Sequence, residues 1–414
     1  MKVILQGAGL RTAVGLGCLE MLFAAETQAG NGLNDVGYGA ESAGMAGADI
    51  AVARDTAALN TNPAGLTQIE GQMLDVLVEP YTFIGQRHQD EFGNNVQPDN
   101  RDGAALGGGY ARRLRNTNFV VGLGMFFQGG AGLAYKDLKT PFGTRDDLSS
   151  LFGSLKLAPG FAWQASEQLS IGAALGLSYS SARQKVFYET STAGDPQTGT
   201  PAFSGLRIDD LAGLSANVKL GLQYRPSPDW VLALVYTSKA PLRLDNGELR
   251  LNNTGSGGGV VRYRDTRITG LAFAPEAGIG ARWRASESLQ LTAEVNWLDW
   301  SSAMASTRLT ARDPDNASAP AKLVIDTPLN WRDQVLFAAG GIWQWTPATE
   351  LIFGVSYARQ PIPKQSVSPT FALLGETSLS AGFTHQVGSQ WRLLVGGTYQ
   401  PAVEMSYTSP LLGQ

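Results

Sequence analysis

The chain has 414 residues and a formal net charge of −4, and only 16% of its residues are charged, against about 25% in average proteins. This acidic balance provides no basic face for nucleic acid. No apolar run reaches the roughly 18 residues that predict a transmembrane helix, whereas the 50 glycines and many aromatic residues favour strands and turns.

Residues 1–29 are typical of a secretory signal peptide. Basic residues precede a mostly small and apolar stretch at 12–25, interrupted by Glu20, and Thr27-Gln28-Ala29 is a small-x-small cleavage site. Lipid attachment at Cys18 is an alternative in a poor sequence context. We predict cleavage after Ala29. Because Cys18 is the only cysteine, the mature chain would have none, which favours a bacterial envelope protein.

Residues 30–72 differ from the rest of the chain. They are rich in Gly and Ala and lack a period of two, and a short helical stretch is expected at 48–59. Asn62 precedes Pro63, whose fixed φ suits the first position of a helical turn. This segment is predicted to be a compact unit of small residues.

From residue 73 to residue 414 the chain alternates with a period of two. In residues 289–297, leucine, alanine, valine and tryptophan share one face, and glutamine, threonine, glutamate and asparagine share the other. Short and long polar breaks alternate, as in outer-membrane barrels. The predicted strands are 73–87, 103–114, 117–128, 151–165, 168–188, 206–225, 229–251, 266–285, 288–311, 324–346, 349–360, 376–387 and 390–407.

Thirteen strands are inconsistent with a bacterial barrel, whose strand number is even. The chain ends in SPLLGQ, with no last strand and no terminal aromatic residue. We therefore expect that one run is miscounted or that a last strand is absent. The predicted fold class is all-β, a transmembrane antiparallel β-barrel of about 14 strands with a small N-terminal plug.

Several motifs, in order, resemble the FadL family of outer-membrane transporters for long-chain fatty acids and other hydrophobic compounds. They are GMAGADIAVARDTAALNTNPAGL with its Asn62-Pro63-Ala64 triplet, FAPEAGIGARW, NWLDWS, LNWRD followed by FAAGG, PIP and LSAGFTHQVGSQWRL. The resemblance covers nearly the whole chain.

The resemblance implies a 14-stranded barrel blocked by a hatch, here residues 30–72. It implies ligand capture in an apolar extracellular groove, transfer to a site inside the barrel, and sideways release beside a kinked third strand. A barrel of this width needs a plug, because its own side chains cannot fill it. The family also implies that Asn62, Pro63 and Ala64 anchor the hatch to the barrel wall, although an ordinary Asn-capped turn would have the same sequence.

Two further candidate sites lie near the third strand. Leu138, Phe142, Leu148, Leu151 and Phe152 place apolar groups in a predicted loop, which suggests the ligand groove or a small core that the loop forms for itself. Gly129 and Gly130 suggest a bend at the lateral gate, or close packing against the hatch.

We predict passive outer-membrane transport of long-chain fatty acids by a monomer in contact with lipid, without catalytic residues, cofactor, metal or nucleic acid. The alternatives are uptake of alkanes or aromatic hydrocarbons and a structural or adhesive barrel. A cation at the end of the ligand pocket would favour a fatty carboxylate over a hydrocarbon. The two histidines, His88 and His385, have no neighbours in sequence that suggest a triad or metal site.

Overall fold

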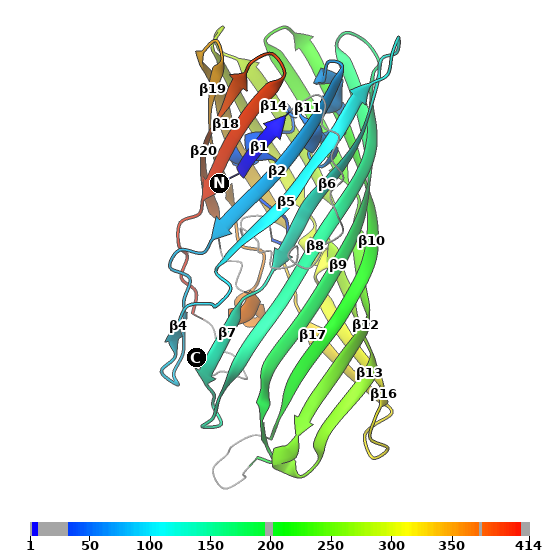
Figure 1. The fold of residues 1–414 in the computed structure, drawn as a ribbon, viewed down its shortest axis with the longest axis vertical. Helices are drawn as coiled ribbons and strands as arrows, with labels where there is room; N and C mark the ends of the chain where they lie inside the picture. The colour runs from blue at the N-terminus through cyan, green and yellow to red at the C-terminus, as the bar shows by residue number, and fades with distance from the viewer. Residues whose placement is uncertain (1, 7–31, 195–201, 372–374, 407–414) are drawn as a thin grey trace.

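A computed structural model describes residues 2–6, 32–194, 202–371 and 375–406. Its main feature is one antiparallel sheet that closes into a barrel around the N-terminal segment (Figure 1). The barrel strands are β2 (Gln72–Thr82), β5 (Asp102–Arg113), β6 (Phe119–Ala131), β8 (Arg145–Gln164), β9 (Leu169–Thr192), β10 (Phe203–Ser227), β11 (Trp230–Thr237), β12 (Ala240–Asn253), β13 (Gly259–Phe273), β14 (Glu276–Arg284), β15 (Leu289–Leu298), β16 (Ser306–Pro314), β17 (Lys322–Pro328), β18 (Gln334–Thr346), β19 (Thr349–Ala358), β20 (Thr377–Val387) and β21 (Trp391–Tyr399).

All thirteen predicted strands are confirmed, and four of them are interrupted. The pairs β11 and β12, β13 and β14, β15 and β16, and β17 and β18 each fall within one predicted strand. In three of the interruptions the chain passes through residues 274–275, 299–305 and 329–333. A period-two pattern could not predict these breaks, because they depend on side chains that enter the barrel.

Strand β1 (Lys2–Gln6) lies between β21 and β2 and closes the sheet. Val3 is opposite Val78 on β2 and Val395 on β21. With β1, the described residues form fourteen successive barrel positions. β1 lies within residues 1–29, so the predicted cleavage after Ala29 would remove it and leave thirteen positions. Residues 7–29 of the predicted signal peptide and the terminal segment 407–414 lie outside the described residues, and cleavage after Ala29 stays a prediction.

The alternation seen in the sequence places apolar side chains outward. On β15, Ala293, Val295 and Trp297 are exposed, whereas Thr292, Glu294 and Asn296 are buried inside. No helix among the described residues is long and apolar enough to cross a membrane.

The connections differ between the two ends of the barrel. One end, here called the short-turn end, carries tight connections such as 114–118, 165–168 and 228–229. At the other, the long-loop end, β9, β10, β12 and β13 extend further (Figure 1). A small hairpin of β3 (His88–Gln89) and β4 (Asn95–Val96) and the strand β7 (Ala134–Lys139) also belong to the long connections. In outer-membrane barrels the short turns are periplasmic.

The N-terminal segment fills the lumen near the short-turn end. It contains α1 (Ala40–Gly44) and the short 3₁₀ helices η3 (Thr56–Leu59) and η4 (Pro63–Gln68), and nearly all of its residues are buried. The expected single helical stretch at 48–59 is wrong, since only its last turn is helical. The remaining short helices are η5 (Thr254–Ser256), α2 (Trp300–Ala303), η6 (Lys364–Ser366) and η7 (Pro369–Phe371).

Candidate functional site

The Asn62-Pro63-Ala64 triplet lies directly against the barrel wall. The Asn62 side chain accepts a hydrogen bond from the Ala64 N–H at 3.1 Å, as an N-cap does, and donates to the Ile50 carbonyl at 2.9 Å and the Leu222 carbonyl of β10 at 3.3 Å. A β-carbon at Gly221 of β10 would overlap the Asn62 amide. The triplet thus combines the capped turn with contact to the wall, and its anchoring role stays a prediction.

We expect the Asn62→Ala variant to loosen the hatch. Asn62 is fully buried, and each of its three hydrogen bonds contributes about 0.5–1.5 kcal/mol. Tryptic cleavage after Arg54 in the folded barrel should therefore be at least about tenfold faster, since about 1.4 kcal/mol is a factor of ten. Asn95→Ala, in the exposed β3–β4 hairpin, is the matched control and should leave the cleavage rate unchanged. Equal rates in both variants would exclude an anchoring role.

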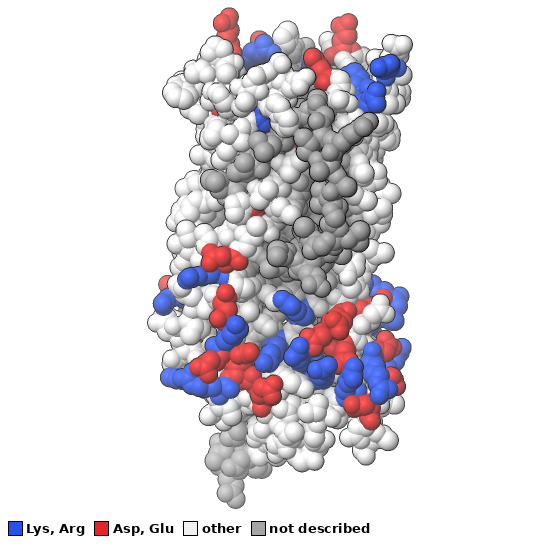
Figure 2. All heavy atoms as spheres, in the orientation of Figure 1, with Lys and Arg blue, Asp and Glu red and all other residues white. Residues whose placement is uncertain are grey.

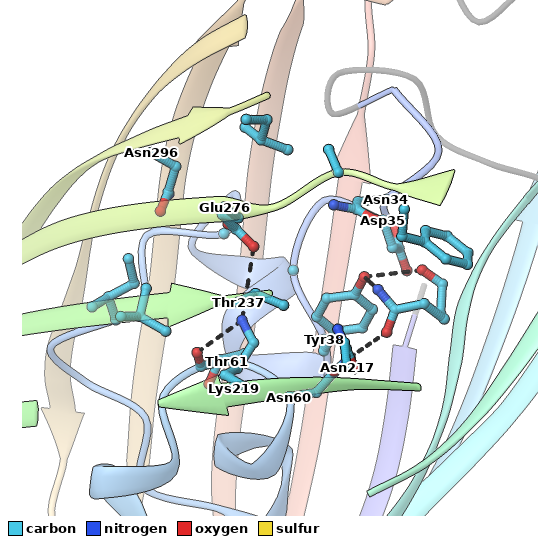
Figure 3. A pocket seen from close by; sticks show the side chains of 18 of the residues that line it. Asn34, Asp35, Tyr38, Asn60, Thr61, Asn217, Lys219, Thr237, Glu276 and Asn296 are labelled. Atoms are coloured by element: carbon cyan, nitrogen blue, oxygen red, sulfur yellow. Dashed lines mark hydrogen bonds and ion pairs between the residues drawn. The ribbon is translucent and has the colours of Figure 1, made fainter. Parts of the chain in front are cut away.

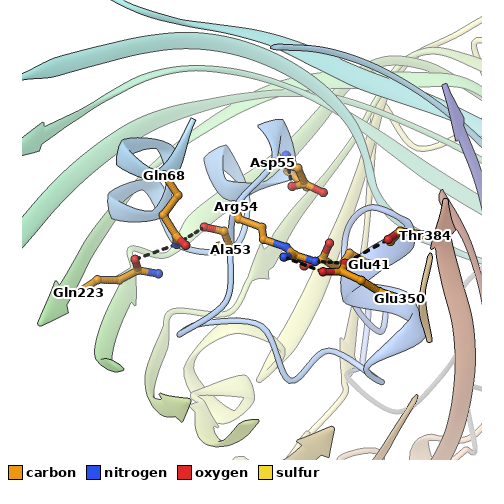
Figure 4. Close-up of polar contacts among 9 residues, drawn as sticks. Glu41, Ala53, Arg54, Asp55, Gln68, Gln223, Glu350 and Thr384 are labelled. Atoms are coloured by element: carbon orange, nitrogen blue, oxygen red, sulfur yellow. Dashed lines mark hydrogen bonds and ion pairs between the residues drawn. The ribbon is translucent and has the colours of Figure 1, made fainter. Parts of the chain in front are cut away.

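Arg54 connects the hatch to the opposite side of the barrel (Figure 4). Its guanidinium lies 2.7 Å from Glu41 within the hatch and 2.5 Å from Glu350 on β19, which also accepts a hydrogen bond from Thr384 on β20. Burial lowers the pKa of Arg54, but the carboxylates of Glu41 and Glu350 raise it by a larger amount, so the net shift of the pKa is upward. The side chain stays charged and holds two acidic groups together.

A cavity of about 70 Å³ lies between the hatch and the inner wall (Figure 3). The carboxylates that line it are Asp35, Asp49, Glu276 and Glu294, and the ammonium groups are Lys156 and Lys219. Burial raises the pKa of Asp49 to about 7. The carboxyl groups of the cavity outnumber its lysines by four to two. The cavity does not favour an anion.

Both lysines of the cavity are already hydrogen-bonded to the hatch. Lys156 donates to the Asn60 side chain at 2.9 Å, and Lys219 donates to the Thr61 carbonyl at 3.3 Å (Figure 3). Lys219 also lies 3.8 Å from Glu276. These hydrogen bonds therefore contribute to docking the hatch.

An apolar cluster fills the lumen next to this cavity, at the level where the strands are interrupted. Trp300 is fully buried and its ring centroid lies 5.3 Å from that of Trp331, while the Phe152 and Phe273 centroids are 6.3 Å apart. The other large apolar members are Leu33, Met45, Leu242, Leu298, Met304, Leu336, Ile342, Ile352 and Ile362. Phe273, Leu298 and Leu336 also line the cavity, so the cluster and the cavity are continuous.

The third barrel strand separates from the second over part of its length. β6 pairs with β5 only from Val120 to Met125, whereas β5 pairs with β2 along its whole length. Among the described residues, segment 102–107 of β5 and segment 126–131 of β6 do not pair with each other. We call this opening the β5–β6 gap. It is the only interruption of this kind that these three strands contain in the described part of the barrel.

The predicted gate residues lie at the inner edge of this gap. The β6–β8 register shifts between Phe127 and Gly129, so Gln128 is the extra residue of a β-bulge. Gly129 has φ +151°, and a β-carbon there would overlap the Leu33 carbonyl oxygen of the hatch. Tyr38 donates to the Gln128 carbonyl at 2.9 Å. The structure therefore brings the bulge, Gly129 and the hatch together, while a gating role stays a prediction.

The prediction of a loop for the groove residues is largely wrong, because Leu138 lies on β7 and Leu148, Leu151 and Phe152 lie on β8. The five residues have different surroundings. Leu138 and Leu148 are buried in a small core with Leu133, Tyr135 and Phe187, and Phe142 stacks on Phe203 at 4.6 Å. Phe152 packs on the lumen cluster instead. The apolar surface of Leu138 and Leu148 is closed in this state, and a capture groove there stays a prediction.

Comparisons with known proteins identify the family. A model described as "Outer membrane protein transport protein (OMPP1/FadL/TodX)" matches residues 21–409. The chain belongs to this family. It is therefore an outer-membrane transport protein for hydrophobic compounds and not an enzyme, as predicted. No curated protein sequence matches the chain significantly.

Solved structures of other family members have the same fold. The Ralstonia pickettii toluene transporter TbuX has a TM-score of 0.66 at 20% identity, covering 88% of this chain and 98% of that one. The P. putida toluene transporter TodX has a TM-score of 0.68 at 19% identity, covering 87% of this chain and 91% of that one. A Pseudomonas aeruginosa FadL homologue has a TM-score of 0.63 at 16% identity, covering 89% of this chain and 97% of that one.

Sequence reasoning missed several residues of this FadL-family site. Leu33 and Tyr38 contact the bulge from the hatch, and Trp300 and Trp331 form the centre of the lumen cluster. One usable signal was Gln128, a lone polar residue directly before two glycines in an apolar strand. The other contacts are long-range and have no local signature.

Proposed function

We propose that this protein is a passive channel for small neutral hydrophobic compounds of monoaromatic size, which leave the barrel sideways through the β5–β6 gap. The observation that carries the proposal is the continuity of the lumen. Leu33 belongs to the apolar cluster around Trp300, and its backbone carbonyl lies against Gly129 at the gap. The cluster and the gap therefore adjoin at one hatch residue, and an apolar ligand that moves between them gains about 25 cal/mol per Å² of buried area without an energy source.

The cavity chemistry supports a neutral ligand over a carboxylate. Lys156 and Lys219 are engaged by the hatch, and the surrounding carboxylates outnumber them. A free cation at the end of the pocket would favour the predicted default, a long-chain fatty acid, and the two lysines are engaged by the hatch. The alternative of aromatic or other hydrocarbons therefore has better support. The names of the toluene transporters of similar fold agree with this choice.

Passage requires the hatch to move. The cavity of about 70 Å³ is smaller than the roughly 150 Å³ that holds benzene in an engineered protein core. The segment from Leu33 to Tyr38 is the part of the hatch that separates the cavity from the gap, because it contacts both. Its displacement would join the two spaces.

Uptake by cells carrying the full-length protein in the outer membrane tests this proposal. We expect saturable toluene uptake several-fold above that of cells without the protein, and oleate uptake at the background level. Benzoate should not compete with toluene, since it adds a carboxylate to a ring of similar size. Saturable oleate uptake that exceeds toluene uptake would instead support the fatty-acid reading.

A further inference from the structure

The outer surface of the barrel changes character toward the long-loop end. Over the middle it is apolar, and the last exposed apolar residues on two neighbouring strands are Tyr179 of β9 and Leu214 of β10. Beyond them, Figure 2 shows a band of charged side chains across the surface at the long-loop end. In an outer-membrane barrel this level faces the headgroups of the outer leaflet.

Within this region, four basic residues lie in one row across four neighbouring strands. Lys185 of β9 is directly opposite Arg207 of β10, Arg207 is opposite Arg250 of β12, and Arg250 is opposite Arg262 of β13. We call these four residues the cationic row. With strands about 4.8 Å apart, the row extends roughly 15 Å around the barrel.

The cationic row faces away from the lumen. The residues next to it in sequence, Ile208 of β10, Leu249 of β12 and Val261 of β13, are buried together in an inner apolar cluster. Because successive side chains of a strand point to opposite faces, Arg207, Arg250 and Arg262 point outward. Their side chains are 37% to 46% exposed.

Like charges directly opposite each other destabilise a sheet, and the carboxylates beside the row compensate only in part. Asp209 pairs with Arg207 at 2.6 Å, and Glu248 pairs with both Arg250 and Arg262. Lys185 pairs with Asp147 of β8 at 3.0 Å and lies 3.9 Å from Asp146. Residues 145–152, 180–192, 203–214, 240–253 and 259–273 contain nine basic and eight acidic residues, an excess of one positive charge. The whole chain has a net charge of −4, so positive charge is concentrated here.

The guanidinium groups also keep donors free for a ligand. Arg207 and Arg250 make their ion pairs through Nε. In the part of the chain that the structure describes, their terminal Nη groups donate no hydrogen bond. A guanidinium with free Nη donors binds a phosphate through two parallel hydrogen bonds.

We propose that the cationic row binds the phosphate groups of lipid headgroups in the outer leaflet. The occupant is a phosphorylated glycolipid whose acyl chains lie on the apolar band below Tyr179 and Leu214. Charge complementarity, the regular spacing of the row and its level just beyond the apolar band support this partner. The site lies on the outside of the barrel and is independent of the transport pathway.

Binding of lipid A to the purified full-length protein in detergent tests the proposal. Native mass spectrometry would compare the wild-type protein with the triple variant Arg207→Gln, Arg250→Gln, Arg262→Gln. We expect the triple variant to retain diphosphorylated lipid A at least tenfold more weakly. Dephosphorylated lipid A should bind both proteins equally weakly.

A matched control removes the same number of charges at the short-turn end. The triple variant Arg115→Gln, Arg225→Gln, Arg284→Gln should bind lipid A like the wild-type protein. Circular dichroism and heat-dependent gel mobility would show that both variants keep the folded barrel. Equal lipid A binding by the row variant and the wild-type protein would overturn the proposal, as would complete competition by millimolar inorganic phosphate, which would indicate a site for free anions.

Discussion

Deletion of Gln128 is expected to reduce toluene uptake at least tenfold while leaving the barrel folded. Gln128 is the extra residue of the β6 bulge, because Phe127 is opposite Leu155 and Gly129 is opposite Ser154. Without it, the flanking residues fit the β8 register without a shift, and the local bend caused by the bulge is lost. β6 could then continue its ladder with β5 beyond Met125 and close the gap. Uptake by cells carrying equal amounts of each protein measures the effect.

A bulge elsewhere in the barrel provides the control for this deletion. On β13, Leu271 is opposite Leu242 and Ile268 is opposite Leu244, so β13 also contains one extra residue there. Its pairing with β16 ends at Thr269, and deleting Gly270 therefore removes a bulge without disturbing a second register. Toluene uptake by the Gly270 deletion should stay near that of the wild-type protein. If the Gln128 deletion transports toluene at the wild-type rate, release through the β5–β6 gap is wrong.

Arg54→Met is expected to open the hatch and to increase ion leakage through the barrel. Arg54 is mostly buried and lies between Glu41 and Glu350, so its removal leaves two carboxylates without their cation. Breaking a buried ion pair from one side costs about 3–5 kcal/mol. Since about 1.4 kcal/mol is a factor of ten, open states should become about two to three and a half orders of magnitude more populated. Single-channel recordings in planar bilayers would count these openings.

An exposed ion pair of the same chemistry provides the control. Arg308 pairs with Asp326 at 2.6 Å, but both side chains are more than half exposed, and such pairs contribute about 0–1 kcal/mol. Arg308→Met should leave the conductance unchanged. Openings as rare in Arg54→Met as in the wild-type protein would show that other contacts, such as that between Gln68 and Gln223 at 3.1 Å (Figure 4), hold the hatch alone.

The strands could be predicted from the sequence because their pattern is local. A residue that faces lipid must be apolar, so every strand carries its own period of two. The breaks within four strands could not be predicted in this way. At residues 299–305 the chain leaves the ladder so that Trp300 enters the lumen, where it packs on Trp331. That partner lies thirty-one residues away in the sequence.

The candidate site was predictable only in part. Gly129 and Asn62 could be identified because each has a local signature, a glycine in an apolar strand and an asparagine before a proline. Their contacts with Leu33 and Leu222 join segments far apart in the sequence. The substrate prediction relied on the resemblance alone, whereas the charges around Lys156 and Lys219 became visible only when the hatch and the wall were placed together.

Photolabelling of the exit path is the most direct test of lateral release through the β5–β6 gap. A neutral alkylbenzene carrying a diazirine would be supplied to the full-length protein in outer-membrane vesicles, irradiated during uptake, and its adducts located by mass spectrometry. We expect adducts at Leu33 and on both sides of the β5–β6 gap, at residues 105–107 and 126–129. Adducts concentrated instead on Thr67, Gln68 and Gln223, at the short-turn side of the hatch, would show that the ligand passes straight through the barrel and would contradict lateral release.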